Sequence, residues 1–177
     1  MRVIGGEYKG RIIEVSKDFD SRPTTDFARE ALFNILSNHF DFSGIRFLDL
    51  FSGTGSVSIE CYSRGCRQID LVDTNGKAIH GVGKLATKLG IQGIHLVKLD
   101  AFRFIHVCKK QYHLIFADPP FDLKNLSGIP DAILGNNLLL PGGWLVLEHP
   151  KNHHFEEKPG FFDERKYGSV HFSFFRA

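Results

Sequence analysis

The sequence contains few cysteines and no long hydrophobic run, and each of these absences excludes a class of protein. The cysteines, Cys61, Cys66 and Cys108, are odd in number, and no two of them have the Cys-x-x-Cys spacing of zinc or redox sites. Hydrophobic residues make up 42% of the chain, but they never form a run near the roughly 18 residues that a membrane helix needs. We therefore expect a soluble globular protein with buried, unreactive thiols and no membrane partner.

Targeting and metal-binding patterns are absent as well. The N-terminal residues have neither the hydrophobic core of a signal peptide nor the Arg-rich amphipathic pattern of a transit peptide. The histidines, including the pair His153 and His154, show neither His-Glu-x-x-His nor paired Cys and His spacing. We therefore expect a cytoplasmic protein without a bound metal.

The charge and the length of the chain set only broad limits. A net charge of +2 over 177 residues permits binding to nucleic acid, but dedicated nucleic-acid-binding proteins are often more basic and cluster their charge. A chain of this length can bury about 70% of its unfolded surface in one core. We expect a single domain over residues 1–177 and a monomer.

Strand-like and helix-like segments alternate from residue 45 onward. The strand-like segments are short and rich in β-branched or aromatic residues, as buried parallel strands are, and they span 46–51, 68–73, 94–100, 112–118 and 144–149. The segments between them have the length and apolar spacing of crossover helices, and they span 56–64, 75–89, 101–110 and about 129–138. Gly65, Gly90 and residues 141–143 fall where these helices should stop. This order predicts an α/β fold with a mostly parallel sheet.

The last part of the chain has a different pattern. Two aromatic-rich segments lie around Pro159 and Gly160, and the second of them ends in the stretch 169–176. Such a pattern predicts a terminal antiparallel hairpin. Two hairpin strands and five parallel strands would together make a seven-stranded sheet.

The first 44 residues form a small N-terminal extension. Residues 1–15 look like a β-rich unit that is broken at its glycines, and a helix follows with Thr25 or Asp26 as its N-cap. An extension of this size, residues 1–44, is too small for a separate domain. We expect it to pack on the main sheet.

A glycine loop lies between the first predicted strand and its helix. Gly53, Thr54 and Gly55 could form a merely tight turn, but glycine there also allows a ligand to approach the backbone closely. Asp73 closes the second strand, 18 residues after Gly55, where a carboxylate in such folds accepts hydrogen bonds from ribose hydroxyls. Both NAD and S-adenosylmethionine carry that ribose.

Two features of the loop favour S-adenosylmethionine. Ser58 occupies the position of the third glycine in the dinucleotide fingerprint, and Asp49 lies on the strand that leads into the loop. A carboxylate is unfavourable beside the pyrophosphate of NAD, whereas it attracts a sulfonium and an ammonium group. The charge pattern therefore selects the sulfonium cofactor.

Acidic residues recur where the predicted strands end. Asp100 follows the third strand and either accepts a hydrogen bond from the adenine amino group or merely caps the next helix. Because ligands in open α/β sheets bind outside the carboxyl ends of the strands, these acids should share one site. The expected cofactor-binding residues are Asp49, Phe51, Gly53, Thr54, Gly55, Asp73, Asp100 and Ala101.

The fourth strand ends in Asp118, Pro119, Pro120 and Phe121, which suit chemistry on an exocyclic amine. The lone pair of such an amine is delocalised, so the Asp118 carboxylate and the Pro119 carbonyl would hold its hydrogens and draw the nitrogen toward tetrahedral geometry. Asp118 could then receive the released proton. The prolines stiffen the turn without adding an N–H donor, and Phe121 offers a face on which an extruded base can stack. The alternative is an ordinary Pro-Pro turn with Phe121 in the core.

The motifs DLFSGTG, LVD, DPPF and RPTTDFAREALFN together resemble those of the RsmD-type bacterial 16S ribosomal RNA (guanine-N2)-methyltransferases. MRVIGGEYKGR and ECYSRG support the resemblance, which covers essentially the whole chain. It implies a class I S-adenosylmethionine-dependent methyltransferase fold of the Rossmann-like type, with ribosomal RNA or the assembling small subunit as partner. Phe27 departs from the family, which often has a basic residue at that position.

Several basic residues lie in the N-terminal extension, where they would suit phosphate contacts. With the resemblance, the expected RNA contacts are Lys9, Arg11, Arg22, Thr25 and Arg29. The alternative is a solvated face with a structural ion pair between Arg29 and Glu30.

Three other functions remain open from the sequence. One is an adenine-N6 or other amino methyltransferase, although DNA enzymes of that kind usually carry an additional target-recognition region. Another is a catalytically silent RNA-binding protein that assists ribosome assembly, against which the intact Asp118 and glycine loop argue. A nicotinamide oxidoreductase is disfavoured by the electrostatics of Asp49.

Overall fold

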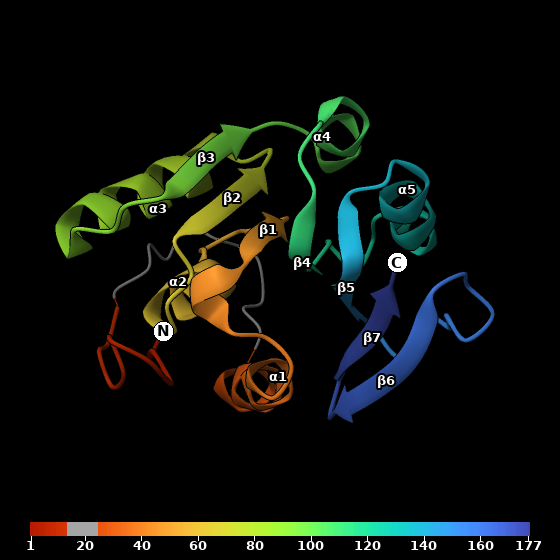
Figure 1. Cartoon of the computed structure of the whole chain (residues 1–177), viewed down its shortest axis with the longest axis horizontal. Coiled ribbons are helices and arrows are strands. Elements are labelled where there is room, and N and C mark those ends of the chain that lie inside the picture. Colours follow the sequence, from red (N-terminus) through yellow and green to blue (C-terminus); the bar gives the residue numbers. More distant parts are fainter. Residues whose placement is uncertain (14–24) are drawn as a thin grey trace.

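A computed structural model of the chain describes residues 1–13 and 25–177, and it is built on a seven-stranded sheet with the order β3-β2-β1-β4-β5-β7-β6 (Figure 1). The strands are β1 (Arg46–Leu50), β2 (Gln68–Asp73), β3 (Ile94–Lys98), β4 (Tyr112–Ala117), β5 (Leu139–His149), β6 (Phe161–Tyr167) and β7 (Val170–Arg176). The first five strands are parallel, and β7 pairs antiparallel with both β5 and β6. The predicted α/β fold with a C-terminal antiparallel hairpin is confirmed.

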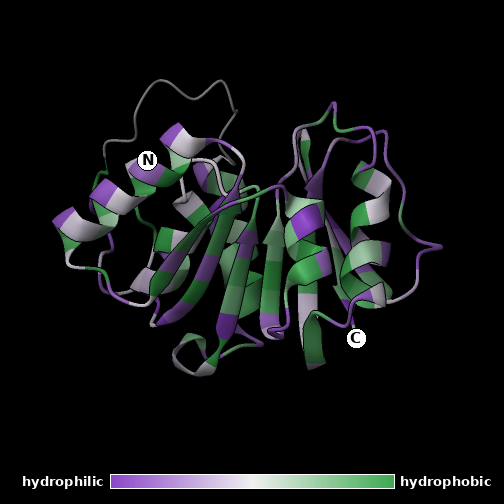
Figure 2. Cartoon of the chain, turned by 90° about the horizontal axis from the view of Figure 1, so that it is seen from above, coloured by the Kyte–Doolittle hydropathy of each residue, from purple (hydrophilic) through white to green (hydrophobic). Residues whose placement is uncertain are grey.

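Helices cover both faces of the sheet: α1 (Asp26–Ser37), α2 (Ser56–Ser63), α3 (Gly76–Leu89), α4 (Ala101–Val107) and α5 (Ile129–Gly135), with short 3-10 turns at Phe42–Gly44 and Leu126–Gly128. Successive strand residues point to opposite faces, so Phe47 packs in the core with α1 and α2, while Leu48 packs in the core with α4 and α5. The central strands β1 and β4 are mostly hydrophobic and buried, and Figure 2 shows green bands on the sheet together with purple ones. None of the described helices is long and apolar enough to cross a membrane.

The structure differs from the sequence prediction at the borders of some elements. Helices α4 and α5 end before the predicted residues, and β5 begins at Leu139, so residues 141–143 lie inside a strand instead of ending a helix. Gly142 has a positive φ of 76°, and the register between β4 and β5 shifts between Tyr112 and Leu114. A short irregularity in the strand therefore explains these glycines. The hairpin turns at Gly168 and Ser169, and the Pro159-Gly160 pair precedes β6.

The N-terminal segment is a minimal β unit whose only bridge within residues 1–13 joins Arg2 and Ile12. It is held to helix α2 by polar contacts: the buried Glu60 carboxylate accepts the backbone N–H groups of Ile4 and Gly5, each at 2.8 Å. Ser63 accepts the N–H of Tyr8 at 2.9 Å. Residues 1–13 of the predicted extension are thus bound to α2.

The Glu60 contacts predict a stability effect. Glu60→Ala should lower the free energy of unfolding by about 2–4 kcal/mol, because two N–H groups and the guanidinium of Arg64 lose a buried charged acceptor. Urea denaturation followed by circular dichroism measures this change. The matched control is Glu7→Ala, whose ion pair with Arg67 is exposed on both sides and should matter by less than about 1 kcal/mol. An equal urea midpoint for Glu60→Ala and wild type would contradict the prediction.

Candidate active site

A cavity of about 780 Å³ opens at the carboxyl edge of the parallel strands. This volume lies within the range of about 300–1,000 Å³ that is usual for small-molecule sites. The loop after β1, the end of β2, the turn after β4 and the start of β7 all contribute lining residues. Thr25, which caps helix α1 by accepting the N–H of Ala28, also lines it. The N-cap prediction at Thr25 is therefore confirmed, and the N-terminal extension reaches the cavity.

The glycine loop at this edge has an unusual backbone. Phe51, Gly53 and Gly55 all have positive φ, of 63°, 50° and 72°, and for the non-glycine Phe51 such a value is uncommon. A Cβ on Gly55 would lie 2.9 Å from a methyl carbon of Val82, so the close packing of the loop on helix α3 also requires glycine. The N–H of Gly53 donates to Asp73 Oδ2 at 2.8 Å. Asp73 thus fixes the loop and faces the cavity at the same time.

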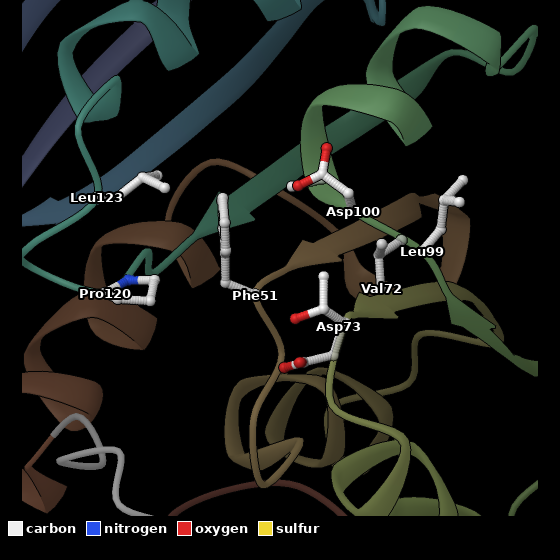
Figure 3. Close-up of a pocket in the computed structure, with 9 residues that line it drawn as sticks. Phe51, Val72, Asp73, Leu99, Asp100, Pro120 and Leu123 are labelled. Carbon is white, nitrogen blue, oxygen red and sulfur yellow. The ribbon is translucent and has the colours of Figure 1, made fainter.

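A smaller pocket of about 140 Å³ adjoins the loop on the side of helix α4. Figure 3 shows the Phe51 ring, Leu99 and Leu123 around it, with the carboxyl groups of Asp73 and Asp100 at its border. Apolar walls with carboxylate acceptors at the edge suit a flat heteroaromatic ring that carries an amino group. Asp100 also accepts the N–H of Arg103 at 3.0 Å, so the capping alternative for Asp100 is observed, while a contact with adenine stays a prediction.

Acidic side chains are concentrated in the main cavity. Burial raises the pKa of Asp49 from 3.8 to about 7, the Asp73 charge adds to the rise, and a hydrogen bond from Ser58 opposes it. Burial also raises the pKa of Asp118 well above its ordinary value, with further contributions from Glu148 and Asp49. Neutral forms of buried acids are favoured when no cation is near. The cavity is therefore suited to a positively charged ligand.

The structure brings most of the predicted site residues together. The main cavity is lined by Thr25, Asp49, Phe51, Gly53, Thr54, Asp73, Asp118, Pro119, Pro120 and Phe121. Phe121 is 47% exposed, so the alternative that places its ring in the core is wrong. Asp100 and Ala101 line the smaller pocket, and Gly55 shapes the loop without lining either one. The Asp118 motif and the glycine loop thus share one cavity.

Sequence reasoning missed several lining residues. Glu148 is 3% exposed and lines the cavity near the end of β5. Its signal was available, because an acid at the end of the strand in WLVLEH repeats the pattern of the other strands. Ser169 and Val170 reach the cavity from the hairpin, and no local pattern marks them because only the sheet order brings them there.

The basic residues of the N-terminal extension differ in their exposure to solvent. Arg29 is 1% exposed, and its Nη2 donates to the carbonyl of Arg2 and to Asp26 Oδ1. The prediction that Arg29 contacts RNA is wrong, because a buried guanidinium that is engaged in these bonds cannot meet a phosphate. The proposed Arg29–Glu30 pair is wrong too, since Asp26 is the partner.

The other expected RNA contacts remain predictions. Lys9 and Arg11 are exposed, and the guanidinium of Arg11 lies 4.6 Å from the centre of the Tyr8 ring. Neither lines the cavity. Arg22 lies outside the described residues. Among residues 1–13 and 25–177, no three His, Cys, Asp or Glu side chains are grouped to hold a metal ion.

Comparisons with known proteins give consistent results. The family model described as Conserved hypothetical protein 95 matches residues 1–176. YlbH of Bacillus subtilis (strain 168) is 35% identical over 164 residues, which cover 90% of this chain and 88% of that protein. Ribosomal RNA small subunit methyltransferase D of Escherichia coli (strain K12) is 30% identical over 148 residues, which cover 84% of this chain and 71% of that protein. The solved structure of the hypothetical protein TTHA0928 from Thermus thermophilus matches with a TM-score of 0.88 at 27% identity, covering 100% of this chain and 99% of that one.

The raised pKa of Asp49 predicts a pH dependence of stability. Between pH 4 and pH 7 the folded protein keeps a proton that the unfolded chain releases, so the wild type loses stability as the pH rises through this window. Asp49→Asn removes this titration. The free energy of unfolding of the variant minus that of wild type should therefore be roughly 2–4 kcal/mol larger at pH 8 than at pH 4. Urea unfolding of the ligand-free protein at a series of pH values measures the difference.

Ser58→Ala provides a second arm of this test. Because the Ser58 hydroxyl donates to the Asp49 carboxylate and lowers its pKa, removal of the hydroxyl should extend the loss of stability to higher pH. Parallel pH profiles for wild type and Asp49→Asn would show that Asp49 does not titrate in this range.

Proposed function

Since the chain belongs to the RsmD-type rRNA methyltransferase family, whose model is described as Conserved hypothetical protein 95, we propose that it transfers a methyl group from S-adenosylmethionine to the N2 amine of a guanine in small-subunit ribosomal RNA. One observation carries the proposal: a single cavity joins the glycine loop to Asp118 and the residues that follow it. Cofactor and amine can therefore meet in the same enclosed space.

The residues of the cavity fit the cofactor. Asp73 offers carboxylate oxygens to a ribose, and the smaller pocket beside it has the apolar walls that an adenine requires. The buried Asp49 carboxyl would lie near positive charge, which favours its ionised form. When bound, S-adenosylmethionine supplies a methyl group activated by attachment to a sulfonium.

Asp118 and the Pro119 carbonyl are proposed to hold the two hydrogens of the guanine amine. This interaction directs the nitrogen lone pair away from the ring and toward the carbon that it will bind. As the nitrogen–carbon bond forms, the bond between that carbon and the sulfonium sulfur would break and leave a neutral thioether. The nitrogen would become positively charged, and Asp118 would accept one of its protons. Burial raises the pKa of the Asp118 carboxyl, and the positive charge of the bound cofactor would favour the ionised form that accepts the proton.

Phe121 is proposed to receive the extruded base. Its ring is half exposed at the cavity and follows directly on the Pro-Pro turn. Stacking of a base on an aromatic ring is worth about 1–3 kcal/mol, which offsets part of the cost of extrusion. A nicotinamide cofactor is disfavoured, because its pyrophosphate would lie beside the buried Asp49.

Asp118→Asn tests the catalytic assignment. The amide keeps the size of the side chain but cannot accept the proton, so kcat should fall by about 100- to 10,000-fold while the Kd for S-adenosylmethionine changes little. Transfer of labelled methyl groups to small-subunit particles from cells that lack the enzyme measures kcat. Asp122→Asn, an exposed neighbour on the same loop, is the matched control and should behave as wild type. Full turnover by Asp118→Asn would remove Asp118 from the mechanism.

Asp73→Ala tests the cofactor site separately. Loss of the carboxylate removes the ribose acceptors and frees the N–H of Gly53, so S-adenosylmethionine should bind about 10- to 100-fold more weakly. Calorimetric titration gives the affinity. Asp41→Ala removes an exposed capping acid elsewhere and should leave the affinity unchanged. Equal affinities for Asp73→Ala and wild type would refute the ribose assignment.

A further inference from the structure

An exposed phenylalanine, Phe27, packs against the half-buried Tyr167 close to residues that line the cavity. Phe27 is 70% exposed in the first turn of helix α1, and its ring centre lies 5.9 Å from that of Tyr167 with an interplanar angle of 80°. Tyr167 ends β6, and its other contact is with the buried Phe172 ring at 6.0 Å. The pair is therefore anchored through Tyr167 to the core, while most of the Phe27 ring surface is open to solvent.

The surroundings connect this pair to the cavity. Thr25 lies two residues before Phe27 and lines the cavity, and Ser169 and Val170 line it directly after the β6–β7 turn. Figure 1 shows the β6–β7 turn next to α1. Neither Phe27 nor Tyr167 lines the cavity itself, so the pair lies beside these lining residues, whereas the exposed Phe121 ring lines the cavity directly. Val107, which is exposed at the end of α4, does not line the cavity either. Phe27 and Tyr167 thus extend the wall of the site outward.

The charges beside the pair are already engaged with one another. Asp26 is bonded to Arg29, and on β6 the side chains of Lys166 and Arg165 pair with acids of the same strand. Each of these three cations therefore has an ion-pair partner, and the Phe27 ring beside them offers an aromatic face. An aromatic face of this kind suits a nucleobase better than it suits a phosphate.

Resting on the function proposed above, we propose that Phe27 and Tyr167 form a stacking platform for an unpaired nucleobase that flanks the target guanine. When the guanine leaves its stack, the next base loses a neighbour and exposes a π-face. A ring held at the mouth of the cavity replaces that neighbour. The platform would thereby fix the RNA strand while the guanine lies inside.

Three substitutions at Phe27 separate stacking from other contacts. Phe27→Ala removes the ring, Phe27→Leu keeps an apolar side chain without a flat face, and Phe27→Trp enlarges the face. On small-subunit particles lacking the modification, Ala and Leu should raise the KM for RNA by about five- to tenfold, with kcat and the Kd for S-adenosylmethionine unchanged. Trp should keep or lower the KM. Val107→Ala, which changes another exposed apolar side chain that does not line the cavity, should match wild type.

Salt dependence separates stacking from a phosphate contact, and fluorescence gives a readout that a structural role would not change. Because stacking releases no counterions, the slope of log KM against log salt should be the same for Phe27→Ala and wild type, whereas Phe27→Lys should steepen it by about 1. The indole of Phe27→Trp should be quenched on titration with an unstructured single-stranded RNA oligonucleotide that contains guanine, beyond any change of the resident Trp144 in wild type.

The outcomes distinguish the platform from the proposed function. Absence of methyl transfer by the wild type would overturn the function, and the quenching experiment would still decide on the platform. An active wild type with an unchanged KM for Phe27→Ala, or no extra quenching in Phe27→Trp, would overturn the platform alone. A wild-type KM for Phe27→Leu together with a raised KM for Phe27→Ala would assign the patch to an apolar protein surface and would also overturn it.

Discussion

The packing of several acids at one edge of a parallel sheet is the constraint on which the rest of this molecule depends. Asp49 lies near the end of β1, Asp118 directly follows β4, and Glu148 lies near the end of β5. These three strands are neighbours in the sheet, with β4 in the middle. Burial raises the pKa values of Asp49 and Asp118, and repulsion adds to the rise, from Asp73 in the case of Asp49 and from Glu148 and Asp49 in the case of Asp118. A cation bound in the cavity lowers the pKa values of these acids again, so binding of the cation is coupled to release of protons from them. The sheet topology thus makes a site for positive charge out of residues that are far apart in sequence.

The backbone around that edge is held by contacts of two kinds. Inside the site, Asp73 binds the N–H of Gly53 and so keeps a loop with three residues at positive φ in one conformation. Farther away, Glu60 on α2 binds the N-terminal segment through the N–H groups of Ile4 and Gly5. Helix α2 begins directly after the glycine loop, so the same helix supports the cofactor side of the site and anchors the N-terminal unit. A change in α2 would therefore affect both the glycine loop and the attachment of the N-terminal segment.

The sequence predicted the features that depend on local order along the chain. The alternation of apolar runs and helical spacing identified all five parallel strands. Acids at strand ends identified Asp73, Asp100 and Asp118, and Asp49 was found on the strand that leads into the glycine loop. Features that depend on packing between distant parts of the chain were not predicted from the sequence. Arg29 looked like a surface cation, yet its neighbours in space, Asp26 and the carbonyl of Arg2, enclose it.

The C-terminal hairpin shows the same limit. Its strands were recognisable, but a hairpin pattern does not say that β7 inserts between β5 and β6, and this insertion brings Val170 to the cavity. The irregular start of β5 was likewise misread, because Gly142 and Gly143 are as typical of a helix end as of a strand irregularity. Local signals therefore located the catalytic motif, and the sheet order decided what surrounds it.

The acids of the cavity also constrain how an RNA can approach. Four carboxyl groups, those of Asp49, Asp73, Asp118 and Glu148, line the space into which a base would have to enter, and negative charge there disfavours a nearby phosphate. Within the roughly 10 Å over which such charges act at moderate salt, uncharged contacts are the effective way to hold a strand. Aromatic faces at the mouth meet that requirement, and cations such as Lys9 and Arg11, which do not line the cavity, can act on the more distant backbone. An acidic centre with aromatic surface at its mouth is thus a consistent solution for a protein that must bind a cationic small molecule and a polyanion at adjacent positions.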